Sequence, residues 1–250
     1  MRVGWSEMSN SNFKEYRVWD ASTRIFHWVN FLSVIMLILF GMLMLYKKEL
    51  GIVSVEAKIA LKEVHVIVGY VFALNLVWRL IWGFIGSRYA LWKNIIPGKG
   101  FIQLLKSYKS SMNISQTQVF LGHNPLGRLA VSAMVLLMVI LMTTGLIRAG
   151  TDIYYPPFGA FVAEYVADAN TDPESLIPYN SKGTHKDKAS KLKAFKKPFG
   201  LIHLYSAYTL IFIIFLHIYF VIRAERKEGG SLVSAMITGK KILKDKPVDL

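Results

Sequence analysis

Apolar residues occur along this chain in four long runs, which are separated by segments rich in charged and polar residues. The runs cover residues 26–46, 65–85, 126–147 and 203–222. Each has about twenty residues, the length at which a helix rising about 1.5 Å per residue crosses ~30 Å of hydrocarbon. Membrane-spanning β-strands would be shorter and would alternate apolar with polar side chains. The pattern therefore predicts an all-α fold: an integral membrane bundle of four helices.

The polar segments between the runs predict how the helices are oriented. Residues 86–125 contain five Lys or Arg and no Asp or Glu, and residues 223–250 are also rich in Lys and Arg. Such segments remain on the cytoplasmic side, which places both termini there. Residues 148–202 then form a long extracytoplasmic loop. Its part 182–197 holds seven Lys, which opposes this orientation, but long loops cross membranes with little regard to charge.

Composition narrows the chemistry that this chain can support. Cys is absent, which excludes Fe–S clusters, thiolate metal sites and thioether-attached haem. The net charge of +14 is explained by the basic loops, which determine topology and meet anionic lipid. No motif of a known nucleic-acid-binding module is present, so no nucleic acid partner is expected. We expect residues 1–250 to form one membrane domain.

Four of the six His lie within or at the start of the apolar runs, where ionisable side chains usually have a function. With alternating helix directions, His27 and His217 lie near one face of the membrane. His65 and His203 lie near the other face. This pairing does not depend on the absolute orientation, because inverting the protein inverts all four residues together.

The spacing of His203 and His217 supports this pairing. Fourteen residues make nearly four helical turns, so the two side chains point to one side within about 40° and lie about 21 Å apart along the axis. One helix thus offers two imidazoles, each facing a His from another helix. Haem iron bound between two His requires such facing pairs. The sequence therefore predicts two haem b groups, ligated by His27 with His217 and by His65 with His203.

Zinc binding, proton transfer and a purely structural role are alternatives to haem for these four His. Zinc needs three or four ligands at one point, whereas these His divide between two depths. A membrane transporter with a His proton relay would contain no pigment and would not need His at paired depths. A haem-free membrane anchor subunit would tolerate the loss of His203 or His217. An optical spectrum separates these classes, because haem b absorbs visible light.

Small and cationic residues near the His are candidates for further contacts to haem. Gly41, Gly69 and Gly145 would allow a flat ligand, or equally a neighbouring helix, to come close. Arg24 and Arg79 are candidate partners of the haem propionates, since a cation in an apolar run needs an anion nearby.

The two His outside these pairs are expected to have simpler roles. His123 precedes Asn124-Pro125, which predicts a helix start with Asn as the cap and Pro at the first position. His185 lies among Lys and is expected at the surface.

Short motifs around these residues carry a family resemblance. In order along the chain they are Arg24-Ile25-Phe26-His27-Trp28, His65, Trp78-Arg79, Gly86-Ser87-Arg88-Tyr89, Gly122-His123-Asn124-Pro125-Leu126, His203 with His217, and Ser234-Ala235-Met236-Ile237-Thr238-Gly239. The chain resembles the b-type cytochrome subunits of membrane-bound Ni/Fe-hydrogenases and related bacterial dihaem cytochromes b. The resemblance spans most of the chain apart from residues 148–202, whose Lys-rich part departs from a typical hydrogenase subunit.

The resemblance implies a bacterial inner-membrane subunit that carries electrons between a periplasmic redox protein and quinone. Asn124 and His217 would lie beside the quinone, near the cytoplasmic haem. Because the third loop departs from the family pattern, the periplasmic partner is expected to be a Ni/Fe-hydrogenase, a c-type cytochrome or another periplasmic reductase. Whether the chain has a quinone-reacting site of its own, or only relays electrons within an oxidoreductase complex, stays open.

Overall fold

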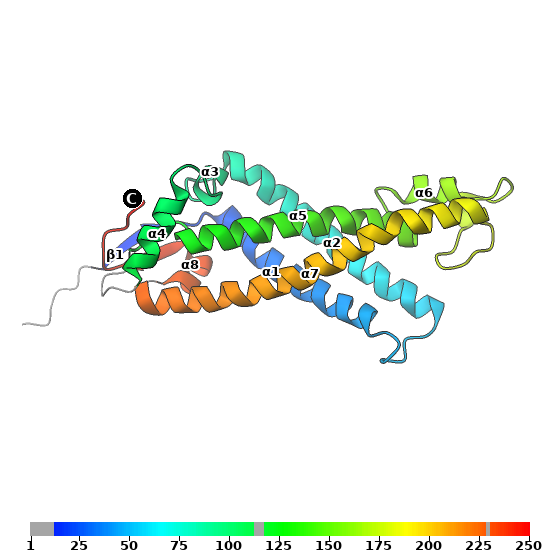
Figure 1. The fold of residues 1–250 in the computed structure, drawn as a ribbon, viewed down its shortest axis with the longest axis horizontal. Coiled ribbons are helices and arrows are strands. Elements are labelled where there is room, and N and C mark those ends of the chain that lie inside the picture. Colours follow the sequence, from blue (N-terminus) through cyan, green and yellow to red (C-terminus); the bar gives the residue numbers. More distant parts are fainter. Residues whose placement is uncertain (1–12, 113–117, 229–230) are drawn as a thin grey trace, which may run out of the picture. The chain divides into compact units, whose positions relative to one another are not determined.

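The structure of this chain is a computed structural model, which describes residues 13–112, 118–228 and 231–250 (Figure 1). Within these residues, four helices are long and apolar enough to cross a membrane, as the hydropathy pattern predicted. They are α1 (Ala21–Leu45), α2 (Val55–Ile85), α5 (Pro125–Ile153) and α7 (Lys186–Glu228).

Shorter elements connect and flank these helices. They are β1 (Lys14–Arg17), α3 (Trp92–Ile95), α4 (Phe101–Ser111), α6 (Gly159–Val166), the 3-10 helix η1 (Pro173–Ser175), α8 (Leu232–Thr238) and β2 (Lys240–Leu243). Strands β1 and β2 pair antiparallel, with Lys14 opposite Leu243 and Arg17 opposite Lys240. The chain is mostly helical, but this small sheet was not predicted. Each strand has only four residues, and more than two hundred positions separate them, so no local pattern announces the pairing.

Contacts within the chain divide it into two compact units, each built from several segments. Unit 1 comprises Met1–Ile25, Ile81–Ser132 and Phe215–Leu250, and unit 2 comprises Phe26–Leu80 and Ala133–Ile214. Each of the four long helices contributes turns to both units.

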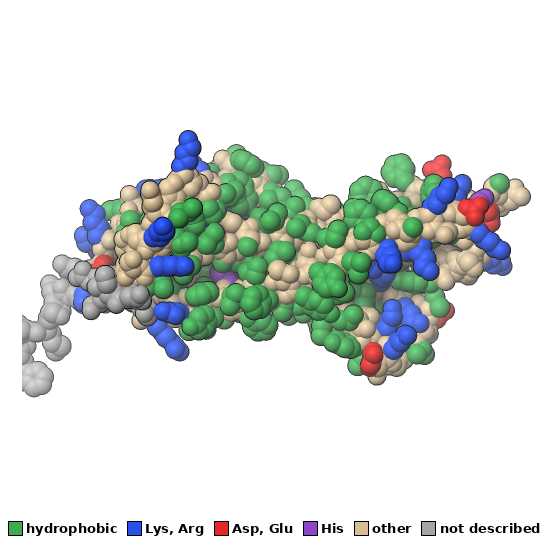
Figure 2. Space-filling model, in the orientation of Figure 1, with side chains coloured by type: hydrophobic (Ala, Val, Ile, Leu, Met, Phe, Trp, Pro, Cys, Tyr) green, Lys and Arg blue, Asp and Glu red, His purple; other side chains and the backbone are tan. Residues whose placement is uncertain are grey.

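In unit 2 the four long helices share one apolar core. It consists of Val34 from α1, Phe72 and Leu76 from α2, Met138 from α5 and Leu210 from α7. Large apolar side chains also cover the outside of the helices (Figure 2). Leu74 is 73% exposed and Phe212 is 62% exposed. A surface of this kind suits hydrocarbon, since exposed apolar patches of this extent are rare on soluble monomers.

The long helices extend beyond the apolar runs because polar residues also favour their ends. Asp20 Oδ1 accepts the N–H of Thr23 at 2.7 Å, which caps α1. Ser54 Oγ accepts the N–H of Ala57 at 3.1 Å and caps α2 eleven residues before His65.

The predicted loop 148–202 is wrong in its bounds. Helix α5 continues to Ile153, and α7 begins at Lys186 and passes through Pro198. Lys, Ala and Leu favour helix here, and Leu192 packs against a small core of Ala163, Val166, Ala167 and Leu176. Only residues 154–185 connect the two helices, and they contain α6 and η1.

In unit 1 the C-terminal segment closes over the residues that precede α5. The carboxylate of Asp249 accepts the N–H groups of Leu121 at 2.6 Å and Gly122 at 2.8 Å. Lys241 donates to the carbonyl oxygens of Phe120 at 3.0 Å and Gly122 at 3.1 Å. These contacts explain how a short terminal strand is held in place.

Asp20 joins two segments of unit 1. Its carboxylate accepts hydrogen bonds from Ser87 and from the indole N–H of Trp82, as well as from Thr23. Partial burial raises the pKa of Asp20, but these hydrogen bonds outweigh burial and hold the pKa below its ordinary value. The cap of α1 is therefore ionised at neutral pH.

Candidate functional site: a facing histidine pair in unit 2

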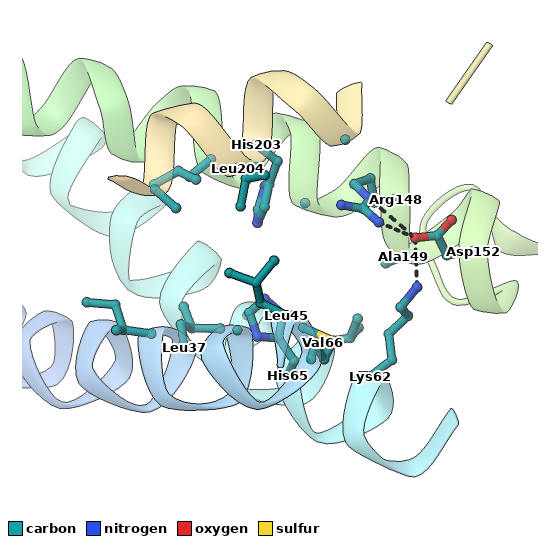
Figure 3. Close-up of a pocket in the computed structure, with 18 of the residues that line it drawn as sticks. Leu37, Leu45, Lys62, His65, Val66, Arg148, Ala149, Asp152, His203 and Leu204 are labelled. Carbon is teal, nitrogen blue, oxygen red and sulfur yellow. Dashed lines mark hydrogen bonds and ion pairs between the residues drawn. The ribbon is translucent and has the colours of Figure 1, made fainter. Parts of the chain in front are cut away.

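His65 on α2 and His203 on α7 point toward one another across a cavity of unit 2 (Figure 3). Their ring centres are 6.4 Å apart, and the ring planes are inclined by 68°. Two imidazoles bound on opposite faces of one metal, with each nitrogen about 2 Å from it and each ring centre about 1 Å farther, have ring centres about 6 Å apart. The spacing of this pair therefore fits an iron held between the two rings.

The cavity around the pair has room for a flat cofactor. Its volume of about 390 Å³ lies within the range of ~300–1,000 Å³ that is usual for cofactor pockets. All four long helices line it. A Cβ on Gly145 would lie 3.3 Å from Cε1 of His203, and one on Gly41 would lie 3.9 Å from Cε1 of His65. Beside Gly69 the space is open to 4 Å. All three glycines line the cavity, which suits a porphyrin.

A hydrogen bond to Thr144 assigns the tautomer of the His203 imidazole. Thr144 Oγ1 donates its hydrogen to the carbonyl of Ile140 at 2.7 Å. The same oxygen lies 2.9 Å from Nδ1 of His203. Because its own hydrogen points to Ile140, it accepts a hydrogen bond from the N–H at Nδ1. The tautomer with hydrogen on Nδ1 leaves the Nε2 lone pair for a metal. Nδ1 of His65, in contrast, is buried with no hydrogen-bond partner among the described residues.

A charged cluster closes one end of the cavity. Asp152 Oδ2 lies 2.9 Å from Lys62 Nζ and 2.9 Å from Arg148 Nη2, and Oδ1 lies 2.9 Å from Lys196 Nζ. The Asp152 side chain is only 7% exposed. Three cations and one carboxylate leave two positive charges beside the cavity. Figure 3 shows Arg148 and Lys62 converging on Asp152 from α5 and α2.

This cluster and Thr144 were missed by sequence reasoning. Arg148 and Asp152 are four residues apart just beyond an apolar run, which is a visible signal for an ion pair at a helix end. Lys62 comes one turn before His65. Nothing in the sequence shows that these residues and Lys196 meet.

The second predicted pair stays a prediction. His27 belongs to unit 2 and His217 to unit 1. The ring of His27 lies edge-on to that of Trp28, with centres 5.4 Å apart. Helix α7 is continuous from His203 to His217, so the spacing argument for one helix face still applies.

The two predicted propionate partners have contacts of different kinds. Arg79 is 5% exposed in unit 2, and its guanidinium lies 5.9 Å from the ring centre of Phe26. Arg24 in unit 1 donates to the carbonyl of Ile237 at 2.5 Å, which joins α1 to α8. Arg24 thus has a structural contact, whereas Arg79 is a buried cation.

Asn124 occupies the cap position predicted for it. Its Oδ1 accepts the N–H of Gly127 at 2.8 Å, and α5 begins at Pro125. Its Nδ2 donates to the hydroxyl of Tyr108 at 2.8 Å. The ring of His123 lies 4.9 Å from that of Trp19, and His185 is exposed as expected. The contact of Asn124 with quinone stays a prediction.

Comparisons with known proteins show to which family this sequence is similar. The family model described as prokaryotic cytochrome b561 matches residues 18–239. A protein of Rhizobium leguminosarum bv. viciae named probable Ni/Fe-hydrogenase B-type cytochrome subunit is 24% identical, over 92% of this chain and 90% of its own. One of the same name from Rhodobacter capsulatus is also 24% identical, over 93% and 83%. The probable Ni/Fe-hydrogenase 1 B-type cytochrome subunit of Escherichia coli (strain K12) is 26% identical, over 62% and 69%.

No solved structure matches the chain. The family model nevertheless spans most of its length, including all four long helices and His65 and His203. This chain therefore belongs to the prokaryotic cytochrome b561 family of membrane proteins, whose name implies haem b as the prosthetic group.

Proposed function

We propose that this chain is a dihaem b-type cytochrome subunit that passes electrons between an extracytoplasmic redox protein and the quinone pool. The single observation that carries the proposal is the facing of His65 and His203 at 6.4 Å across a glycine-lined cavity. Two His ligands close the iron to substrates, which favours electron transfer over oxygen chemistry. When bound, haem supplies a one-electron carrier, and the chain supplies its position and surroundings.

Residues at the end of the cavity would hold the haem carboxylates. Lys62 and Arg148 line the cavity and already contact the buried carboxylate of Asp152. The two positive charges left over in this cluster would bind two propionates. Arg79 and Arg24 are the corresponding candidates for the second haem.

The second haem would bind between His27 and His217. These residues lie near the opposite ends of their membrane spans from the first pair, which supports two haems at two depths. In this arrangement residues 1–250 act as one domain of the bacterial inner membrane with both termini in the cytoplasm. Quinone would react beside His217 and Asn124.

The names of the relatives bear on the partner. The proteins similar to this chain are called subunits of Ni/Fe-hydrogenases. A Ni/Fe-hydrogenase is therefore the first candidate for the extracytoplasmic partner, and a c-type cytochrome is the alternative suggested by the basic start of α7.

Haem content tests the proposal directly. We expect the protein purified from bacterial membranes to hold two haem b groups per chain, with a sharp visible band on reduction. We also expect a quinol added to the oxidised protein to produce part of that band. A colourless protein would favour the transporter or the haem-free anchor, and one haem per chain would contradict the second pair.

Gly145→Leu should remove the haem of unit 2. A side chain at this position meets His203 at 3.3 Å and enters the cavity. We expect haem per chain to fall from two to about one, measured on protein that still accumulates in the membrane. Gly98→Leu is the control, since a Cβ at Gly98 meets nothing within 4 Å. Full haem content in Gly145→Leu would contradict the placement.

Thr144→Val should shift the midpoint potential of the same haem upward. The hydroxyl accepts the Nδ1 proton of His203, which makes the imidazole a stronger donor to oxidised iron. One hydrogen bond of about 1 kcal/mol corresponds to about 40 mV for one electron. Spectroelectrochemical titration measures the shift, and Thr144→Ser should restore the original value. Thr143→Val is the control, because among the described residues its hydroxyl donates to the carbonyl of Val139 at 2.9 Å and not to His203.

A further inference from the structure

Unit 2 contains a second cavity, which is lined mainly by cations. Its volume is about 330 Å³, and it lies between α5 and the first turns of α7. Arg148, Lys193, Lys196 and Lys197 line it together with Asp152. Four cations and one carboxylate leave three positive charges. Since Asp152 already contacts Arg148 and Lys196, the charges of Lys193 and Lys197 have no carboxylate in this cavity to balance them.

The position of this cavity along α7 corresponds to the surface of the membrane. Residues 199–222 contain no Asp, Glu, Lys or Arg, and 24 residues of helix extend about 36 Å, slightly more than the ~30 Å of hydrocarbon. Lys196 and Lys197 precede this apolar stretch, separated from it only by Pro198. Their ammonium groups therefore lie at the level of the lipid headgroups.

One face of α7 is basic at its start and apolar farther along, which matches the charged headgroup and the acyl chains of a phospholipid. Lys193, Lys197, Leu201, Tyr205, Tyr208 and Phe212 follow one another at spacings of three and four residues, so they form a continuous stripe. All six are exposed, and Phe212 is 62% exposed. In Figure 2 Lys and Arg side chains gather over the first turns of α7, and hydrophobic side chains cover the turns that follow. The stripe begins with cations and continues as apolar surface.

We propose that this basic cavity binds the phosphate of an anionic phospholipid whose acyl chains lie along the stripe. Lys193 and Lys197 would contact the phosphate, with Arg148 and Lys196 behind them. Leu201 and Tyr205 would contact the part of the acyl chains nearest the headgroup. Free phosphate would use only the cations, and an acidic protein would not need the apolar part of the stripe. Lys193 and Lys197 are not part of the proposed haem site, so variants at these two residues test the lipid site separately from the haem assignment.

Lipid titration of the purified protein tests this site. Protein in neutral detergent is titrated with phosphatidylglycerol or with phosphatidylcholine of the same acyl chains, and bound lipid is counted by native mass spectrometry. We expect the unchanged protein to prefer phosphatidylglycerol. Lys193→Gln with Lys197→Gln should lower that affinity about twenty-five-fold, a factor of about five for each basic residue. Haem content should not change.

A charge-matched variant serves as the control. Lys186 and Lys191 are exposed on the same helix, and neither lines the cavity, so replacing both by Gln should leave the affinity within about twofold of the unchanged protein. Equal losses in the two variants would overturn the site in favour of general surface charge. Equal binding of both lipids would also overturn it, as would displacement of the lipid by millimolar inorganic phosphate. Weaker binding of a protein partner with unchanged lipid affinity would point to a docking surface instead.

Discussion

His203→Ala should yield a protein with one haem b, whereas the proposed dihaem arrangement gives the unchanged protein two. His203 faces His65 at 6.4 Å, so without one ring a haem in this cavity would have only one of the two His that would hold it. His65→Ala should give the same loss from the other side of the cavity. Haem is measured as a ratio to protein in purified samples, and the remaining haem is characterised by redox titration.

The control for this experiment is His185→Ala. His185 is an exposed residue outside the cavity, so its removal should leave both haems in place. His217→Ala should remove the other haem, which gives the two variants different remaining midpoint potentials. Identical potentials in His203→Ala and His217→Ala, or two haems retained in either, would contradict the proposed pairs.

Asp152→Asn should strongly destabilise unit 2. The carboxylate is 7% exposed and contacts Lys62, Arg148 and Lys196, which come from three different membrane spans. An Asn leaves three cations close together without the carboxylate that contacts them all, and breaking a buried ion pair costs about 3–5 kcal/mol. Lys62 and Lys196 retain some access to solvent, so we expect the lower end of this range. The midpoint temperature of thermal unfolding should fall by about 10 °C. It is measured by circular dichroism or by the loss of haem absorbance.

Asp187→Asn is the control that separates the loss of the Asp152 contacts from a simple change in net charge. Asp187 lies exposed in the first turn of α7, and its loss alters the charge of the chain by the same amount. A second change, Lys196→Gln, should restore part of the stability of Asp152→Asn because it removes one of the unpaired cations. Equal unfolding temperatures for Asp152→Asn and Asp187→Asn would refute the role of this cluster.

Local patterns in the sequence were enough to predict the spans and the first His pair. A run of about twenty apolar residues is a local property, and the solvent it needs follows from its length. The depth of a His follows from its place in such a run, so His65 and His203 were expected to face each other and do. The cap at Asn124-Pro125 was also a local signal, and it is confirmed.

Boundaries of helices depended on contacts that hydropathy does not measure. The Lys-rich start of α7 was expected to be loop because it is too polar to enter lipid. It is helical because its propensity favours helix and because Leu192 and Lys196 pack against other parts of unit 2. The sheet of β1 and β2 was missed for a related reason, since its pairing joins the two ends of the chain.

The sequence by itself determined that this protein lies in a membrane, which His meet in unit 2 and which chemistry the lack of Cys excludes. Only the tertiary structure decided that Thr144 orients His203, and that Asp152 gathers cations from three helices beside the cavity. Depth in a membrane depends on counting residues along one helix. The direction of a side chain toward another helix depends on how the helices are rotated and packed against one another. No single segment of the sequence encodes this packing.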